Sequence, residues 1–188
     1  NYNMTMFKIA QEIKCLGFEV CSSHLGDAKM NDKGELKKDF YLIQDGIKNP
    51  RLSEYYNSYS ILNGEKNGIT VLDLDDMSKP ICNTILALCE GYPIVKTRKG
   101  YHIYAKYTKE LKDGIYKPLG FDILNGGRVV IAPYNKYHYG NETFSYEPVN
   151  EFKFPTETFS HDIITLINSS FTQAGISIKK EEEEAELF

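Results

Sequence analysis

Two aspartates, Asp73 and Asp75, stand two residues apart at the end of an apolar run, Ile-Thr-Val-Leu-Asp-Leu at 69–74. Such a run indicates a buried β-strand, and because side chains alternate along a strand, both carboxylates lie on one face. Carboxylates this close repel each other unless a cation lies between them, and Mg²⁺ prefers oxygen ligands. A pair of such ions can serve phosphoryl transfer. The pattern therefore favours a metal site over the alternative, a solvated strand end at which Asp75 and Asp76 begin a turn.

A basic segment follows at 96–104, with the sequence Lys-Thr-Arg-Lys-Gly-Tyr-His-Ile-Tyr. Arg98 and Lys99 offer positive charge suited to phosphates, and Gly100 permits close approach of the backbone. His102 lies on the strand that follows the glycine. A lone histidine on a strand usually only packs, so one interpretation is an exposed basic hairpin. Beside a glycine and two cations, a phosphate contact is an equally good interpretation.

A third acid, Asp122, is flanked by apolar residues, and an Asn-Gly-Gly sequence and Arg128 follow it. The segments 121–124 and 128–132 are strand-like, and the Asn-Gly-Gly between them is typical of a hairpin turn. Taken alone, Asp122 is interpreted as an ordinary acid on a strand surface. Arg128 lies across the predicted hairpin from it, so a salt bridge between the two is a further alternative.

The elements that must position these residues follow from periodicity and turn residues. Helices are predicted at 5–16, 52–56, 80–90 and 156–174, and strands at 18–21, 59–62, 69–74, 94–97, 101–107, 121–124, 128–132 and 144–146. The polar segment 22–39 is predicted to be loop. This order indicates one α+β domain over 1–178, with a mostly antiparallel sheet and one hydrophobic core. Residues 179–188 are expected to form an acidic, disordered tail or the start of a linker.

The net charge of the 188 residues is −4, which taken alone argues against a basic nucleic-acid-binding protein. The sum hides a segregation of charge, because residues 179–188 carry a net charge of −3 while residues 96–117 carry +5. The basic stretch surrounds His102 and supplies charge suited to phosphates. Net charge is therefore a poor criterion for excluding nucleic acid as a ligand.

Several classes of protein are excluded by what the sequence lacks. No window approaches the ~18 apolar residues that a membrane span needs, and no signal pattern opens the chain, so an intracellular, cytoplasmic location without a membrane is expected. Cys15, Cys21, Cys82 and Cys89 form no CxxC pair and are interpreted as reduced, mostly buried thiols rather than metal ligands. No phosphate loop of the Walker A type is present.

In their order, the three features resemble the three motifs of the archaeo-eukaryotic primase superfamily: an acid pair, a Gly-x-His strand, and an Asp-bearing strand before a Gly-Gly turn. The likeness is closest to its Prim-Pol family, the bifunctional DNA primase-polymerase domains of plasmids, phages and large DNA viruses. It covers 59–147. The chain departs from the family at Gly100, where a small hydroxyl residue is common, at Lys99, which interrupts a Gly-Gly run, and at Tyr134, which replaces a second proline.

The resemblance implies a mostly antiparallel, RRM-like sheet with flanking helices. It implies that two catalytic metal ions, Mg²⁺ or Mn²⁺, are bound by Asp73, Asp75 and Asp122. It also implies that the phosphates of an incoming nucleotide are contacted by His102 with assistance from Arg98, Lys99, Gly100 and Arg128.

The activity that the resemblance implies is that of a DNA primase and polymerase, which transfers a nucleotide from an NTP or dNTP to a 3′-hydroxyl. The implied partners are a single-stranded DNA template, the nucleotide, and a helicase domain on the same full-length protein. Three tyrosines, Tyr134, Tyr137 and Tyr139, offer stacking faces for template bases, with ordinary packing in a loop as the alternative.

Two other functions are weighed against this one. The first is a degenerate domain of the same fold that binds single-stranded nucleic acid without catalysis, although all three acids are present. The second is a metal-dependent nicking phosphodiesterase on a related small sheet. Such enzymes typically carry a His-hydrophobic-His pair and a nucleophilic tyrosine on a helix, whereas this sequence has no His-x-His and no tyrosine in its predicted last helix.

Overall fold

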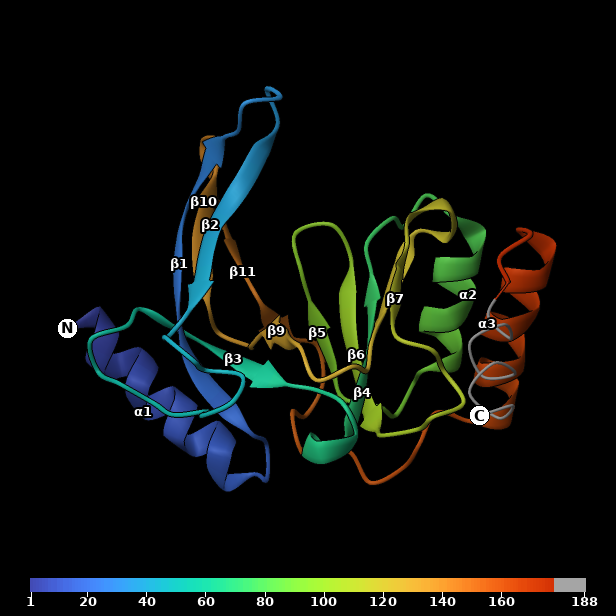
Figure 1. Ribbon diagram of the computed structural model, residues 1–188, viewed down its shortest axis with the longest axis horizontal. Helices are drawn as coiled ribbons and strands as arrows, with labels where there is room; N and C mark the ends of the chain where they lie inside the picture. Colours follow the sequence, from blue (N-terminus) through green and yellow to red (C-terminus); the bar gives the residue numbers. More distant parts are fainter. Residues whose placement is uncertain (178–188) are drawn as a thin grey trace, which may run out of the picture.

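The computed structural model describes residues 1–177 of the chain (Figure 1). The α-helices are α1 (Tyr2–Cys15), α2 (Pro80–Leu88) and α3 (His161–Gln173). The strands are β1 (Val20–Met30), β2 (Leu36–Leu42), β3 (Ser58–Leu62), β4 (Ile69–Leu74), β5 (Ile94–Lys96), β6 (Tyr101–Lys106), β7 (Gly114–Tyr116), β8 (Phe121–Leu124), β9 (Val129–Ile131), β10 (Lys136–Tyr139), β11 (Glu142–Ser145) and β12 (Glu147–Pro148). The tail predicted at 179–188 lies outside the described residues.

Within the described residues, the strands form two larger sheets and one hairpin. The six-stranded sheet, here called the central sheet, has the order β12-β5-β6-β4-β8-β7, and the four-stranded N-terminal sheet has the order β2-β1-β3-β9. Strands β10 and β11 form the hairpin. Every pair of neighbouring strands is antiparallel. The prediction of an α+β fold with mostly antiparallel pairing is therefore confirmed.

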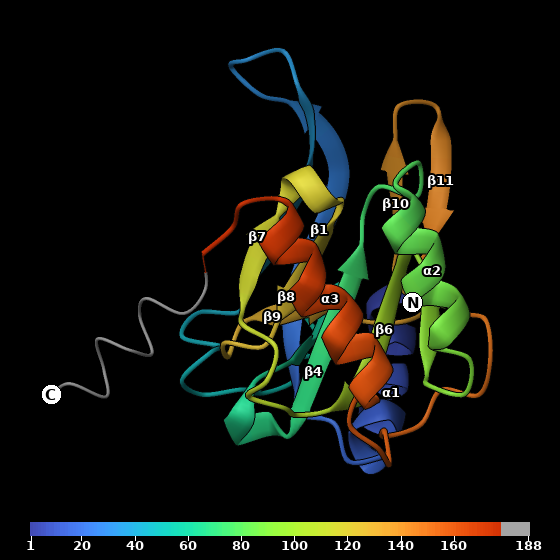
Figure 2. The ribbon, with the colours of Figure 1, turned by 90° about the vertical axis from the view of Figure 1, so that its right-hand side faces the viewer.

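Helices α2 and α3 cover one face of the central sheet (Figure 2). Pro80 occupies the first turn of α2, where a missing N–H costs nothing, and the Ser160 side chain accepts a hydrogen bond from the Ile163 N–H at the start of α3. Apolar residues of β4, β6 and β8 pack beneath them, including Leu72, Leu74, Ile103, Phe121 and Ile123. The alternation of β4 therefore leaves Asp73 on the opposite face.

A second apolar cluster lies on that opposite face and joins the two sheets. Its members come from α1, from the N-terminal sheet and from the central sheet, and include Ile13, Val20, Ile61, Val71, Val95 and Tyr104. The prediction of one hydrophobic core is wrong because β4 is apolar on both faces until Asp73. The cluster fixes α1 and the N-terminal sheet beside the face that carries the acid (Figure 1).

Three other expectations of secondary structure are wrong. Residues 22–39 are not loop but form most of the β1–β2 hairpin, whose outer half exposes polar side chains and therefore shows no apolar alternation in the sequence. Residues 52–56 form no helix. Helix α3 begins at His161 instead of 156, because Glu157 and Thr158 pair with Lys106.

The hairpin predicted between 121–124 and 128–132 does not form. Strand β8 pairs with β4 and β7 in the central sheet, while β9 pairs with β3 in the N-terminal sheet. The chain crosses between the sheets at Asn125, whose side chain bonds the Thr70 hydroxyl at 2.7 Å and donates to two backbone carbonyls. The Asn63 side chain accepts from the next backbone groups, the Gly127 and Arg128 N–H. These side-chain anchors outweigh the turn preference of Asn-Gly-Gly.

No helix among residues 1–177 is long and apolar enough to cross a bilayer. The four cysteines are free thiols, and Cys21, Cys82 and Cys89 are buried whereas Cys15 is exposed. The prediction of reduced, mostly buried thiols is thus confirmed.

Candidate functional site

Three residues that the sequence singled out form one row across the central sheet. Asp73 on β4 lies directly opposite His102 on β6 and directly opposite Asp122 on β8. Paired residues of neighbouring strands project from the same face, with Cβ atoms about 5 Å apart. The three motifs, which are far apart in the sequence, are therefore brought to one place on the face away from α2 and α3.

Asp73 and His102 form a pair at the centre of this row. The His102 Nε2 lies 3.5 Å from the Asp73 Oδ1, and the residue His102 is 6% exposed. Burial alone would raise the pKa of Asp73, but the charge and hydrogen bond of His102, with Lys38 and Lys99 nearby, hold that pKa below its ordinary value. The other ring nitrogen of His102, Nδ1, is buried and has no hydrogen-bond partner among residues 1–177. The histidine therefore has hydrogen-bonding capacity that the protein alone does not use.

Asp122, the second acid of the row, has its pKa shifted in the direction opposite to that of Asp73. Burial, followed by the negative charges of Asp73 and Asp75, raises the pKa of Asp122 to about 6. The carboxyl therefore holds its proton into a pH range where an ordinary aspartate is ionised. This is the behaviour expected where carboxylates share a site without a cation to offset their repulsion.

The basic turn between β5 and β6 is held tightly against the end of β4. Thr97 and Gly100 bond each other twice, through the Thr97 N–H and the Thr97 hydroxyl. A Cβ atom on Gly100 would lie 1.7 Å from the Leu74 carbonyl oxygen. The close backbone approach expected at Gly100 is therefore present, and its partner is β4. This contact sets the turn beside Asp75, which follows Leu74 directly.

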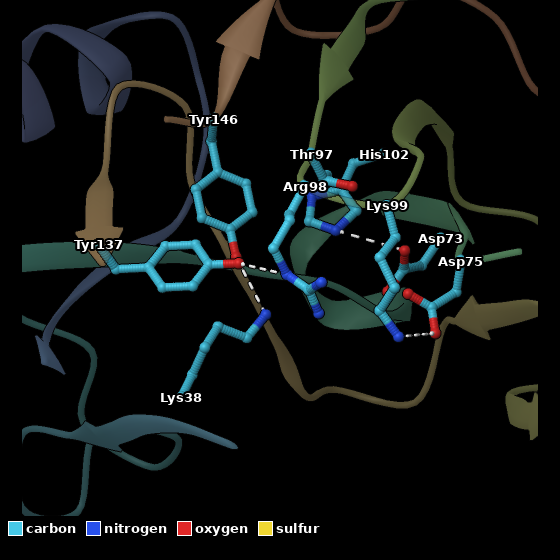
Figure 3. Close-up of a pocket in the computed structure, with 9 residues that line it drawn as sticks. All are labelled: Lys38, Asp73, Asp75, Thr97, Arg98, Lys99, His102, Tyr137 and Tyr146. Carbon is cyan, nitrogen blue, oxygen red and sulfur yellow. Dashed lines mark hydrogen bonds and ion pairs between the residues drawn. The ribbon is translucent and has the colours of Figure 1, made fainter. Parts of the chain in front are cut away.

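The row and the turn border a small open pocket (Figure 3). Its volume is about 40 Å³, room for a few water-sized groups. The pocket is lined by Lys38 from β2, Asp73 and Asp75 at the end of β4, Thr97, Arg98 and Lys99 from the turn, His102 from β6, Tyr137 from β10 and Tyr146 beyond β11. Five of the predicted site residues thus meet here: Asp73, Asp75, Arg98, Lys99 and His102.

The two cations of the turn have different partners. Lys99 forms an ion pair with Asp75, with 3.4 Å between the Nζ and an Oδ atom, and both side chains are about half exposed. Arg98 donates from Nε to the Tyr137 hydroxyl at 3.2 Å, and its guanidinium lies 3.7 Å above the ring of Tyr139. Among residues 1–177, Arg98 has no carboxylate within 4.0 Å.

Two predicted site residues do not line the pocket. Asp122 lies one strand beyond it in the row, on the far side of Asp73. Arg128 forms an ion pair with Asp113 at 3.0 Å instead of the salt bridge to Asp122 considered from the sequence. Because the 121–132 hairpin does not form, Arg128 directly precedes β9, the edge strand of the N-terminal sheet, and is not paired across a hairpin from Asp122.

Sequence reasoning missed Lys38, Thr97 and Tyr146 as pocket residues. Lys38 lies in the stretch predicted to be loop, and only the pairing of β2 with β1 aims it at the pocket. Of the three tyrosines considered for base stacking, Tyr137 is buried with its hydroxyl in the pocket, Tyr139 lies under Arg98, and Tyr134 lies in a groove beside α1. None of the three presents a free ring face to the pocket.

Carboxylate oxygens are the type of ligand that a hard divalent cation prefers, but the three aspartates are not yet arranged around one point. Among residues 1–177, no three His, Cys, Asp or Glu side chains converge as a ready-made metal group. The three aspartates nevertheless start from one row and the strand end beside it, and burial together with the charges of Asp73 and Asp75 raises the pKa of Asp122. Asp73 and Asp75 are each engaged by a cationic or ionisable side chain of the protein. A site with all three aspartates as ligands would need their carboxylates to converge more closely than they do among residues 1–177 of this structure.

Negative and positive side chains lie at different ends of the pocket. Carboxylates occupy one end, and Lys38 and Arg98 occupy the other (Figure 3). A ligand that carries both divalent cations and phosphates complements this separation. No family model and no curated protein matches this chain.

Proposed function

We propose that the protein is a template-dependent DNA primase and polymerase, a nucleotidyltransferase that joins an NTP or dNTP to a 3′-hydroxyl during DNA replication. The observation that carries this proposal is the row in which Asp73 lies between His102 and Asp122 on one face of the central sheet. This chemistry needs carboxylates for metal ions and a hydrogen-bond donor for phosphate in the same place. The row brings together the acid pair, the histidine strand and the third acid in one place.

The topology supports an RRM-like, primase-polymerase core. Strands β4 and β5, joined by α2, are separated in the sheet by β6, which makes a split β-α-β unit. Adding β8 on the other side of β4 gives the order β5-β6-β4-β8, with all neighbours antiparallel. In the usual β-α-β-β-α-β arrangement the second helix precedes the last strand, whereas here α3 follows it and the β7 hairpin fills the earlier link.

In this proposal, two Mg²⁺ or Mn²⁺ ions are held by Asp73, Asp75 and Asp122. When bound, such ions lower the pKa of the attacking 3′-hydroxyl and offset charge on the triphosphate. With such ions bound, Asp73 and Asp75 would be metal ligands in place of partners for His102 and Lys99. The His102 Nε2 and the Lys99 amine are then free to donate to phosphate oxygens. In the absence of a ligand, the two internal pairs therefore give Asp73 and Asp75 partners within the protein.

Other residues position this chemistry without taking part in it. Gly100 lets the turn lie against β4, and the turn directs Arg98 and Lys99 to the pocket. Arg128 pairs with Asp113 and does not line the pocket, but its charge acts on the Asp122 carboxyl, so its contact with the nucleotide stays a prediction. A single-stranded DNA template, a helicase domain on the same full-length protein and an intracellular location complete the proposal, and these three depend on the resemblance in sequence.

The test is primer extension with single-stranded template, nucleotides and Mn²⁺ or Mg²⁺, with and without a primer. We expect extension by the wild type and none by an Asp73→Asn/Asp75→Asn variant. The matched control is Asp32→Asn, which removes an exposed carboxylate from the β1–β2 turn and should extend like the wild type. Equal extension by the double variant and the wild type would contradict the proposal.

A second function, binding of single-stranded nucleic acid without catalysis, is favoured by one observation. Among the described residues no ready-made metal group exists, and Asp73 and Asp75 each have a partner within the protein. If the wild type binds single-stranded DNA yet neither it nor the double variant extends a primer under any metal, this second function replaces the first.

A further inference from the structure

The end of the pocket that faces the acids is built from two cations and two phenols, here called the phenol bridge: Lys38, Arg98, Tyr137 and Tyr146. The Lys38 Nζ donates to the Tyr146 hydroxyl at 3.1 Å, and the Arg98 Nε donates to the Tyr137 hydroxyl at 3.2 Å. Figure 3 shows the two cations reaching the phenol oxygens from different sides. Lys38 comes from the N-terminal sheet, whereas Arg98 comes from a turn of the central sheet.

The phenols orient the cations without neutralising them. Burial raises the pKa of both Tyr137 and Tyr146, so both hydroxyls stay uncharged at neutral pH. Among residues 1–177, neither Lys38 nor Arg98 has a carboxylate within 4.0 Å. A cation that is fixed in place and not paired with an anion is prepared to receive one.

The two phenols of the bridge are buried and packed on both sides, whereas Lys38 itself is exposed. Tyr146 is 2% exposed, its ring stacks on His102 with 5.8 Å between centroids, and its backbone bonds Tyr134 and Asn135 in both directions. Tyr137 is 4% exposed, and the Lys38 Nζ lies 5.5 Å from the centroid of its ring. Buried aromatic anchors of this kind hold long cationic side chains in one arrangement and reduce the entropy lost on binding.

We propose that Lys38 and Arg98, positioned by Tyr146 and Tyr137, bind the polyphosphate of the incoming nucleotide. Strand β2 thereby contributes a phosphate-binding residue, Lys38, that lies outside all three sequence motifs. The identity of the ligand as a nucleotide rests on the proposed function, whereas the polyphosphate chemistry follows from the phenol bridge. Because Lys38 and Arg98 belong to different sheets, a bound polyphosphate also ties the β1–β2 hairpin to the central sheet.

The sugar-phosphate backbone of a nucleic-acid strand offers the same phosphate chemistry, but the observations favour a triphosphate. Asp73 and Asp75 line the opposite end of the pocket and repel a strand whose counterions have been released. A triphosphate brings divalent cations with it, and the carboxylates attract these. Because this open pocket has room for only a few water-sized groups, the base and the sugar of a nucleotide must lie outside it.

The test is titration calorimetry with inorganic triphosphate in Mg²⁺ buffer, using the wild type, Lys38→Met and Lys37→Met. Lys37 is the matched control because it is the neighbouring lysine on β2, points to the other face and pairs with Glu35. We expect Lys38→Met to weaken triphosphate binding about tenfold, as loss of one hydrogen bond to a charged group does. Lys37→Met should change it less than about twofold, as a surface charge does. Tyr146→Phe, which keeps the ring, should weaken it about threefold.

Three outcomes would overturn the inference. One is equal weakening by Lys38→Met and Lys37→Met, which would mean that only overall charge matters. Another is unchanged triphosphate binding by Lys38→Met. The third is that Lys38→Met weakens binding of an oligo(dT) strand but not of triphosphate, which would assign the cations to the strand.

The inference and the proposed function fail separately. If the wild type extends no primer but binds triphosphate in a Lys38-dependent manner, the polymerase proposal fails and the polyphosphate site stands. If the wild type extends primers and Lys38→Met shows an unchanged KM for nucleotides, the site fails and the polymerase proposal stands.

Discussion

Asp122 is the side chain whose proposed role as an ionised metal ligand most clearly opposes the stability of the metal-free fold. Its carboxyl is half-buried beside two other acids, and its pKa rises from the ordinary 3.8 to about 6. The folded protein therefore binds this proton more tightly than the unfolded chain does, and ionising Asp122 costs the folded state free energy. A group that destabilises the folded protein at neutral pH is typical of a functional site.

We expect Asp122→Asn to raise the free energy of unfolding at pH 7 in metal-free buffer by about 1–2 kcal/mol, after allowance for screening by solvent. The sign follows from linkage: the destabilisation by wild-type Asp122 is absent below pH 3.8, grows as the pH rises toward about 6, and is constant above that. The two proteins should therefore be equally stable near pH 3.5. Urea unfolding at several pH values measures the difference, and a less stable Asn variant at pH 7 would refute this assignment.

Among the elements, the β5–β6 turn is the one whose position depends most on a glycine, Gly100. Its Arg98 and Lys99 reach the pocket only because Gly100 lets the turn lie against the Leu74 carbonyl. The Gly100 N–H and carbonyl both bond Thr97, so the turn cannot move away without losing hydrogen bonds. A side chain at position 100 must displace β4 or open the turn.

We expect Gly100→Ala to lower the free energy of unfolding by about 2–3 kcal/mol, the cost of overpacking against backbone. Gly34→Ala is the control, because a Cβ there meets nothing within 4 Å and only the positive φ of 77° opposes it. That control should cost about 1 kcal/mol. Urea unfolding of both variants is the measurement, and equal losses would show that the contact with Leu74 does not matter.

Some of the strands could be predicted from the sequence, and others could not. Strands β3, β4, β6 and β8 could be predicted because each is an apolar run bounded by turn residues, and β4 was predicted at its observed bounds. The row of Asp73, His102 and Asp122 depends on the register between strands, which no local pattern states. The β1–β2 hairpin is held by backbone pairing under polar side chains, so neither it nor Lys38 could be recognised. Asn125 overrode a turn preference through side-chain hydrogen bonds that exist only in the folded chain.

In the molecule as a whole, the site lies where two sheets meet. The apolar cluster shared by α1, the N-terminal sheet and the central sheet fixes Lys38 opposite the acids. The net charge of −4 therefore conceals a pocket with carboxylates at one end and, at the other, two cations without a carboxylate partner among residues 1–177. This arrangement across two sheets is what we infer to select a metal-bound polyphosphate.

Primer extension by Asp122→Asn tests the central claim most directly, because stability and activity are expected to change in opposite directions. With template, primer, nucleotides and Mn²⁺, we predict that extension falls about 100-fold or more, since a lost metal ligand removes several kcal/mol of transition-state stabilisation. The same protein should be at least as stable as the wild type at pH 7, which excludes misfolding as the cause. Extension by Asp122→Asn at the wild-type rate would contradict the claim that the row of Asp73, His102 and Asp122 is a nucleotidyl-transfer site.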